Sequence, residues 1–349
     1  MGGSLGLAAQ DVSLSQQERF QRRWPALRDP HVRALAWLLD SPDLMAAEAA
    51  CWEGRIASLG PVSDEVAAWL NGLQQDPALN QALHAHMERQ PSGRLGRYAE
   101  KLLGFYLERQ GQLVAANLQV RNDGATRETL GEFDFLVRRP GVLADGGLEH
   151  WEFATKFYLL EPAPRLSGAT GALADAFVGP NLADSLGRKM RKIMQQQLML
   201  SRHPAAAAVL PAPVASAGAL VKGWLFYRDG IPVALPPAMG IAEDHCRGFW
   251  SDASGLPARY DQNSCFLLLP RLEWLAPARA QRARTLGLPG LLAELETRFV
   301  AEDAPVMVAV CRSLSGEDDE VVEVERGFVV PAHWQQRAQE SVRHAVVRV

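Results

Sequence analysis

The stretch GEFDFLVRRPGVLADGGLEHWEFATKFYLL, residues 131–160, decides the fold of this chain. It contains two runs in which apolar and polar side chains alternate, joined by a loop rich in glycine. Alternation with a period of two is typical of β-strands. The short loop between the runs predicts that the two strands are antiparallel neighbours in one sheet.

The two faces of this predicted strand pair differ in their chemistry. Successive side chains of a strand point to opposite faces, so the aromatic residues are expected to be buried together under a covering layer. These residues are Phe133, Phe135, Trp151, Phe153 and Phe157. The same alternation predicts that Asp134, Glu152 and Lys156 share the other face. Two carboxylates and an ammonium group on one face favour a functional site, although an internal salt-bridged cluster is the structural alternative.

A helix is predicted before the strands, over residues 94–110, and Gly111 ends it. Its apolar residues recur with a period of 3.6, and Glu100 lies on the flank of the resulting stripe. We expect Glu100 to be partly buried, as a carboxylate next to small and apolar neighbours. The alternative is a boundary glutamate that reaches water with its carboxylate.

Further elements complete an α-β-β-β-α-β order and an α/β fold class. Residues 112–121 and 219–228 have the apolar character of strands. A long helix is predicted over residues 182–200, with Asn181 as its N-cap. The polar side of this helix carries a candidate substrate-binding set, formed by Lys189, Lys192, Gln195 and Gln196. A solvated basic face is the simpler explanation of this set, but beside an acidic sheet face it could bind phosphates.

The length of 349 residues allows one large domain or two modest ones. The sequence predicts four regions, of which the first is a flexible tail and the second a helical segment. The third is the strand-containing core, and the fourth is an α+β extension packed on that core. The predicted bounds are 1–20, 21–90, 91–230 and 231–349.

Composition limits the partners of this chain. The formal net charge is −4, so nucleic acid would have to be bound through a local patch. The four cysteines are scattered, which is typical of a reducing compartment. The N-terminus lacks the features of a signal peptide, and no apolar run is long enough to span a membrane. We therefore expect a cytoplasmic protein without a membrane partner; the oligomeric state is left open.

The order of the charged residues carries a resemblance. Glu100 on a helix, Asp134 in GEFDF, and Glu152 and Lys156 on the next strand resemble the PD-(D/E)XK nuclease superfamily. The segments RALAWLLDSPDLM, GRYAEKLLGFYLE, HWEFATKFYL and GPNLADSLGRKM are also similar to a bacterial domain-of-unknown-function family, number 1853. This second likeness extends over most of the chain from about Trp24 onward.

The superfamily resemblance implies a restriction-endonuclease-like αβββαβ core with a mixed four-stranded sheet. It also implies a nuclease that depends on Mg²⁺, or on Mn²⁺, and hydrolyses phosphodiesters in DNA or RNA. Asp134 would be the main metal ligand, with Glu152 and Glu100 as further ligands. Lys156 would stabilise the charge that develops on the phosphate. The polar face of the long helix, including Lys189, would contact the substrate backbone.

One departure from the superfamily pattern bears on activity. The superfamily places the acid and the lysine two residues apart, about 6.6 Å along a strand. Here Glu152 and Lys156 are four residues apart, about 13 Å in a regular strand, and Ala154 stands between them. The competing interpretation is therefore a non-catalytic nuclease-fold protein that binds nucleic acid or a protein partner.

Overall fold

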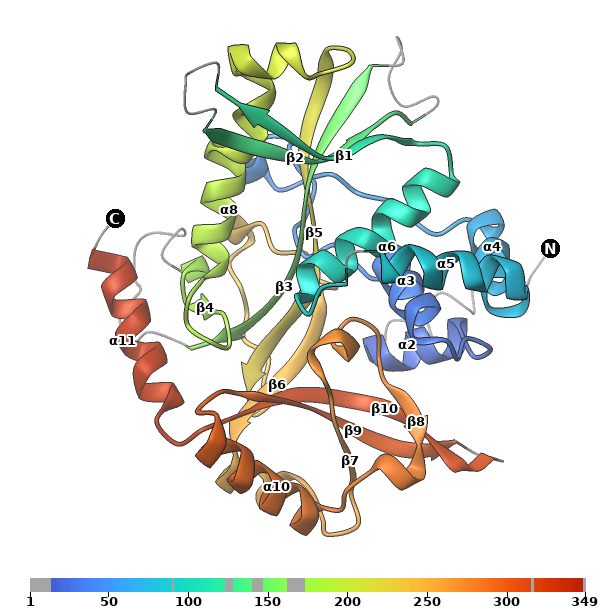
Figure 1. The fold of residues 1–349 in the computed structure, drawn as a ribbon. Coiled ribbons are helices and arrows are strands. Elements are labelled where there is room, and N and C mark those ends of the chain that lie inside the picture. Colours follow the sequence, from blue (N-terminus) through green and yellow to red (C-terminus); the bar gives the residue numbers. More distant parts are fainter. Residues whose placement is uncertain are drawn as a thin grey trace, which may run out of the picture.

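One mixed β-sheet forms the centre of the molecule. The computed structural model describes residues 14–89, 91–122, 128–139, 147–161, 173–314 and 317–347. Ten strands of these residues belong to the sheet: β1 (Leu113–Arg121), β2 (Thr129–Val137), β3 (Leu148–Leu160), β4 (Phe177–Val178), β5 (Val214–Arg228), β6 (Cys246–Asp252), β7 (Cys265–Leu268), β8 (Arg279–Gln281), β9 (Val306–Leu314) and β10 (Glu317–Val330). The main path has the order β1-β2-β3-β5-β6-β10-β9-β7, while β4 pairs with β3 and β8 with β10 (Figure 1).

The predicted order of the first elements is confirmed except for the short strand β4, which lies between β3 and α8. Helix α6 (Leu95–Arg109) precedes β1, β2 and β3, and helix α8 (Leu186–Gln195) connects β3 to β5. The pairs β1–β2 and β2–β3 are antiparallel, whereas β3 and β5 are parallel. The predicted size of the sheet is wrong, because β6 pairs with β5 and continues the sheet into residues 231–349.

The remaining helices lie on the two faces and at the ends of the sheet. They are α2 (Gln16–Arg23), α3 (Pro30–Asp40), α4 (Asp64–Gln75), α5 (Pro77–Glu88), α9 (Leu256–Arg259), α10 (Leu288–Ala301) and α11 (Trp334–Val347). Ser63 caps α4, and Asp76 ends α4 and caps α5. None of the helices in the described ranges is long and apolar enough to cross a membrane.

Two predicted boundaries are wrong. Ser185, and not Asn181, caps α8, and its side chain accepts a hydrogen bond from the Arg188 backbone N–H. The residues before it form a turn in which Leu182 has a φ of 60°, so the helix cannot begin there. At the N-terminus, α2 starts at Gln16 within the predicted tail, and residues 1–13 lie outside the described residues.

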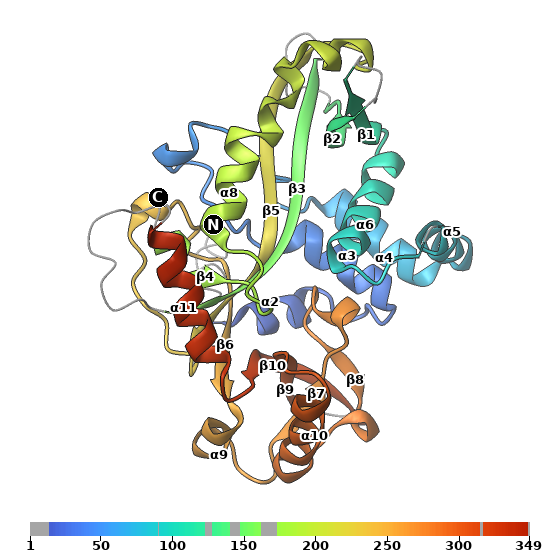
Figure 2. The same cartoon turned by 60° about the vertical axis from the view of Figure 1, so that its left-hand side comes forward.

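Helices cover both faces of the strand pair β3–β5. On one face, Trp37 of α3 stacks on Trp224 of β5 with ring centroids 6.1 Å apart. Helix α6 contacts β3 and also packs through Gly104 against Phe135 of the neighbouring β2. On the other face lies α8, whose buried residues include Met190 and Ile193. Figure 2 shows α8 on one side of β3 and β5 and α6 on the other.

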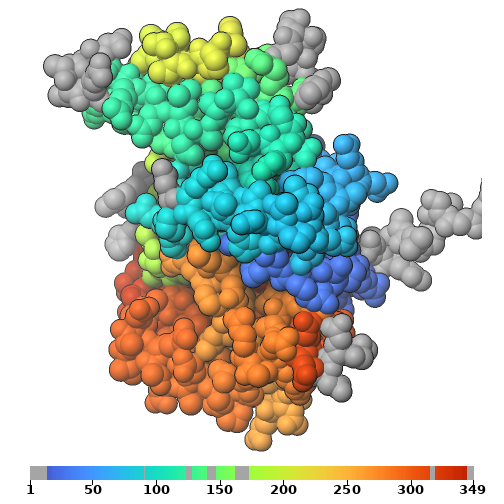
Figure 3. Space-filling view, turned by 45° about the vertical axis from the view of Figure 1, so that its right-hand side comes forward, coloured from blue at the N-terminus to red at the C-terminus, as the bar shows by residue number. Residues whose placement is uncertain are grey.

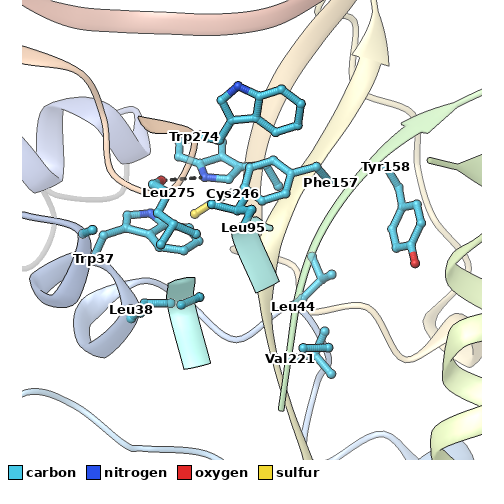
Figure 4. Close-up of a cluster of buried hydrophobic side chains, with 14 of the residues drawn as sticks. Trp37, Leu38, Leu44, Leu95, Phe157, Tyr158, Val221, Cys246, Trp274 and Leu275 are labelled. Atoms are coloured by element: carbon cyan, nitrogen blue, oxygen red, sulfur yellow. Dashed lines mark hydrogen bonds between the residues drawn. The ribbon is translucent and has the colours of Figure 1, made fainter. Parts of the chain in front are cut away.

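The largest hydrophobic cluster joins regions that are distant in sequence. Trp274, in the segment after β7, contacts Phe157 of β3 and Phe328 of β10, with centroid distances of 5.6 and 5.1 Å. Trp37, Phe157 and Trp274 belong to this cluster, together with residues of α3, α6 and β5 (Figure 4). In the space-filling view, the N-terminal helices lie between the C-terminal strands and the β1–β2 end of the molecule (Figure 3).

Candidate functional site

Strands β2 and β3 diverge at Asp134. Their ladder pairs Phe135 with Trp151 and continues only toward Val137 and Glu149. Beyond Phe135, the carboxylate of Asp134 replaces the ladder, because its Oδ2 accepts a hydrogen bond from the Phe153 backbone N–H at 3.0 Å. The side chain of Asp134 therefore lies in the gap between the two strands.

The alternation of β2 reverses at the same residue. Phe135 belongs to the main core, whereas Phe133 packs in a separate cluster with Val120 and Leu200. The register places Asn117 of β1 opposite Asp134, and Asn117 has a left-handed φ of 54°. The prediction that the two phenylalanines are buried in one layer is therefore wrong. Because of the irregularity at Asn117 and Asp134, the side chains of Phe133 and Phe135 lie on opposite faces of the sheet.

Glu152 lies beside Asp134 and is almost completely buried, with 1% of its surface exposed. Its Oε1 is 3.0 Å from His150 Nε2, and its Oε2 accepts a hydrogen bond from Gln197 Nε2. The carboxyl groups of Asp134 and Glu152 influence each other's ionisation. Burial raises the pKa of both groups, and the charge of Glu152 raises the pKa of Asp134 further.

Glu100 approaches this pair from α6 and is partly buried, as predicted, with 14% of its side chain exposed. Burial raises the pKa of Glu100, and Arg97 offsets part of this effect. Arg97 Nη1 donates to Glu100 Oε1 at 2.8 Å and also to Asn117 Oδ1, while its Nη2 is 3.6 Å from Glu132 Oε1. Arg97 thus links the acidic cluster to the irregular position of β1.

Lys156 is paired with a residue that the sequence analysis does not single out. Alternation along β3 places it on the same face as Glu152. Its Nζ is 3.0 Å from Asp184 Oδ2, which also accepts a hydrogen bond from the Tyr158 hydroxyl at 2.9 Å. The charge of Lys156 is therefore directed toward the turn before α8.

Lys189 of α8 is the cation that is coupled to the acidic pair. Its Nζ donates to Gln197 Oε1 at 3.0 Å, and Gln197 in turn donates to Glu152. Burial and the nearby Lys156 lower the pKa of Lys189, whereas the charges of Glu152 and Asp134 oppose this shift. A continuous contact path therefore leads from Lys189 through Gln197 to Glu152.

The other residues of the predicted substrate-binding set are exposed. Lys192, Gln195 and Gln196 are on the solvent side of α8 and its end. Gln197 was not predicted, although it belongs to the run QQQ at 195–197. Helix α8 ends at Gln195, and a 3₁₀ segment, η2 (Gln197–Arg202), begins two residues later. Because of this change in the backbone, Gln197 points toward the sheet.

The donor set of the pair is all oxygen, which suits a hard cation such as Mg²⁺. Within the described ranges, no group of three or more histidine, cysteine, aspartate or glutamate side chains is arranged to hold a metal ion. Glu100 therefore does not complete a three-carboxylate centre with Asp134 and Glu152. Mg²⁺ is usually bound in proteins through one or two carboxylates together with water molecules.

The fold and this cluster define a mixed α/β protein with paired carboxylates at a strand divergence and a lysine above them. The chain belongs to the family described as "Domain of unknown function (DUF1853)", whose model matches residues 33–330. No curated protein and no solved structure matches the chain.

Proposed function

We propose that this protein is a metal-dependent nuclease of the PD-(D/E)XK type that hydrolyses phosphodiesters in DNA or RNA. The position of Asp134 is the observation that carries the proposal. Its carboxylate fills the gap between two diverging strands and lies next to Glu152. A hairpin built for stability alone would continue its ladder of backbone hydrogen bonds at this point.

Asp134 and Glu152 are the residues that would hold the cation. Their raised pKa values reflect burial and like-charge crowding, both of which a divalent cation relieves. When bound, such an ion polarises a phosphate oxygen and lowers the pKa of a coordinated water. Glu100, held by Arg97 at the edge of the pair, would orient a water molecule.

Lys189 takes the role of the site lysine in this proposal, in place of Lys156. Lys189 is coupled to both carboxylates, whereas Lys156 is paired with Asp184. Its ammonium group would stabilise the negative charge that develops on the phosphate. Gln197 would position both partners, because it contacts Lys189 and Glu152 at once.

Substrate contacts would come from the solvent side of α8. Arg188, Lys192, Gln195 and Gln196 are exposed there. This is a local basic patch on a chain with a net charge of −4, so binding should weaken steeply with salt. The high burial of Glu152 favours the competing function, a nuclease fold that binds nucleic acid without cleaving it.

The test is a cleavage assay with labelled single- and double-stranded DNA and RNA, in Mg²⁺ or Mn²⁺ and in excess chelator. We expect metal-dependent cleavage of at least one substrate. Lys189→Met should reduce the rate by about 100-fold or more, the scale for losing one preorganised electrostatic contact. Lys156→Met, which removes a lysine from the same face, should reduce it far less.

The controls separate chemistry from folding. Each variant is checked by thermal unfolding, and substrate binding is measured by anisotropy with chelator present. If the Lys189→Met variant cleaves the substrate as fast as the wild type does, the role proposed for Lys189 is contradicted. Salt-dependent binding without cleavage of any substrate would establish the non-catalytic alternative.

A further inference from the structure

A large cavity lies away from the acidic pair. Its volume is about 1290 Å³, and it is lined by α2, by the segment that follows α3 and by the loop before β6. Lys222 of β5 also lines it and is paired in register with Thr155 of β3. Because Thr155 alternates with Lys156, the cavity opens on the sheet face opposite to Glu152 and Lys156.

Several donors at the wall of this cavity lack acceptors. Among the described residues of the wall, Arg19 Nε and Ser41 Oγ are buried without a hydrogen-bond partner. Asp43 Oδ1 is a buried acceptor that likewise receives no hydrogen bond, although it forms an ion pair with Lys222. Lys222 is 2% exposed, and its Nζ contacts Ser41 O at 2.6 Å and Asp43 Oδ1 at 2.8 Å. An ammonium group has three hydrogens, so one remains for a further acceptor.

These donors select the chemistry of an occupant. A buried polar group without its hydrogen bond is costly, so unpaired donors at a cavity wall favour an oxygen acceptor inside it. Arginine is suited to a carboxylate, because its planar fork can donate two parallel hydrogen bonds. The wall therefore fits a negatively charged oxygen group.

The charge balance of the lining excludes a polyanion. Four cationic side chains line the cavity, together with five carboxylates, of which Glu48, Glu243 and Asp244 are exposed. An occupant with several negative charges would be repelled by these exposed carboxylates. A positively charged group on the occupant would instead pair with them. Phe20 and Trp37 add apolar surface.

We infer that this cavity binds a small zwitterion of the amino acid class. Its carboxylate contacts Arg19, Ser41 and Lys222, and its ammonium group faces the exposed carboxylates. The inference is independent of the proposed nuclease function, because no residue of this cavity contributes to the acidic pair.

The experiment is a thermal-unfolding screen of the full-length protein against each standard amino acid at millimolar concentration, followed by calorimetry. We expect saturable binding of at least one amino acid. Its methyl ester, which lacks the carboxylate charge, and its analogue without the amino group should bind about 10-fold or more weakly, since each loses one charged contact.

Variants link the binding to the cavity. Arg19→Gln should weaken binding by roughly 10- to 100-fold, and Arg19→Lys should recover part of this loss. Arg298→Gln, on the exposed side of α10, is the matched control and should bind as the wild type does. Asp134→Asn should also bind normally, which separates this inference from the nuclease proposal.

If no amino acid binds saturably, if the amine-free analogue binds as tightly, or if Arg19→Gln has no effect, the inference is overturned.

Discussion

At the scale of single residues, the acidic pair concentrates charge that the fold alone does not need. Asp134 and Glu152 have raised pKa values, so the folded protein holds their protons more tightly than the unfolded chain does. Without metal, the contribution of this pair to stability is therefore fully present below the ordinary carboxyl pKa of about 4, and it is lost as pH rises through the raised values. Glu152 remains in place through its contacts with His150 and Gln197.

Asp134→Asn is predicted to raise the stability of the metal-free protein at pH 8. The change removes one charge from the crowded pair, so the gain should be on the order of 1 kcal/mol. The dependence of stability on pH between about 4 and 8 should also become flatter. Urea unfolding at several pH values, with chelator present, measures both effects. Equal pH profiles for variant and wild type would contradict the like-charge interpretation.

Added Mg²⁺ or Mn²⁺ is predicted to raise the melting temperature of the wild type. A ligand at 100 times its dissociation constant stabilises the folded state by about 2.7 kcal/mol. Asp134→Asn should lose this increment, whereas Lys156→Met should retain it, because Lys156 is directed toward Asp184. Calorimetric scans with increasing metal provide the measurement. An equal shift in the Asp134→Asn protein would place the metal elsewhere.

At the scale of elements, α8 must pack closely on the sheet to bring Lys189 over the carboxylates. Gly187, in the first turn of α8, packs against the segment before β4, where an added Cβ would be 2.6 Å from Asp175 Oδ1 and 3.0 Å from the Asp175 backbone N. Asp175 is itself fixed by Ser185 Oγ at 2.6 Å and by Arg191. The helix start is therefore held by packing and by hydrogen bonds together.

Gly187→Ala is predicted to destabilise the protein by about 1–3 kcal/mol, the usual cost of overpacking. The matched control is Gly96→Ala in α6, where nothing lies within 4 Å of an added Cβ. That change should stabilise the protein by roughly 0.5–1 kcal/mol, because alanine favours a helix over glycine. Denaturant midpoints compare the two. A Gly187→Ala protein as stable as Gly96→Ala would show that α8 can shift freely.

At the scale of the whole molecule, the sheet is continuous across the predicted boundary at residue 230. β6 pairs with β5 over Trp224 to Arg228, and Arg326 of β10 lies over the Trp224 ring at 4.4 Å. Phe226 packs against Phe328 with ring centroids 4.8 Å apart. The C-terminal strands therefore complete the core of the strands that carry the site.

A fragment of residues 1–230 is predicted not to fold stably. The fragment lacks β6 and β10. Without them, β5 would be an apolar edge strand with no partner on one side, and Trp224 and Phe226 would be exposed. Circular dichroism and limited proteolysis of the purified fragment test this expectation, with the full chain as reference. A fragment with a cooperative thermal transition and protease resistance would show instead that the first 230 residues form an independent domain.

The sequence alone determined the local elements and the candidate residues on them. The periodicity of residues 94–110 gave α6 and the partial burial of Glu100, and alternation gave β2 and β3 with Glu152 and Lys156 on one face. These features depend on neighbours within a few residues, for which helix and strand periods are sufficient evidence. Ser63 and Asp76 act through equally local hydrogen bonds.

Only the tertiary structure decided which groups meet. Asn117 reverses the alternation opposite Asp134, and the early end of α8 turns Gln197 toward Glu152. Lys189 contacts Gln197, which donates to Glu152, whereas Lys156 is paired with Asp184. Such contacts join residues that are distant in sequence. The periodic pattern within one helix or strand does not tell which other element will pack against it.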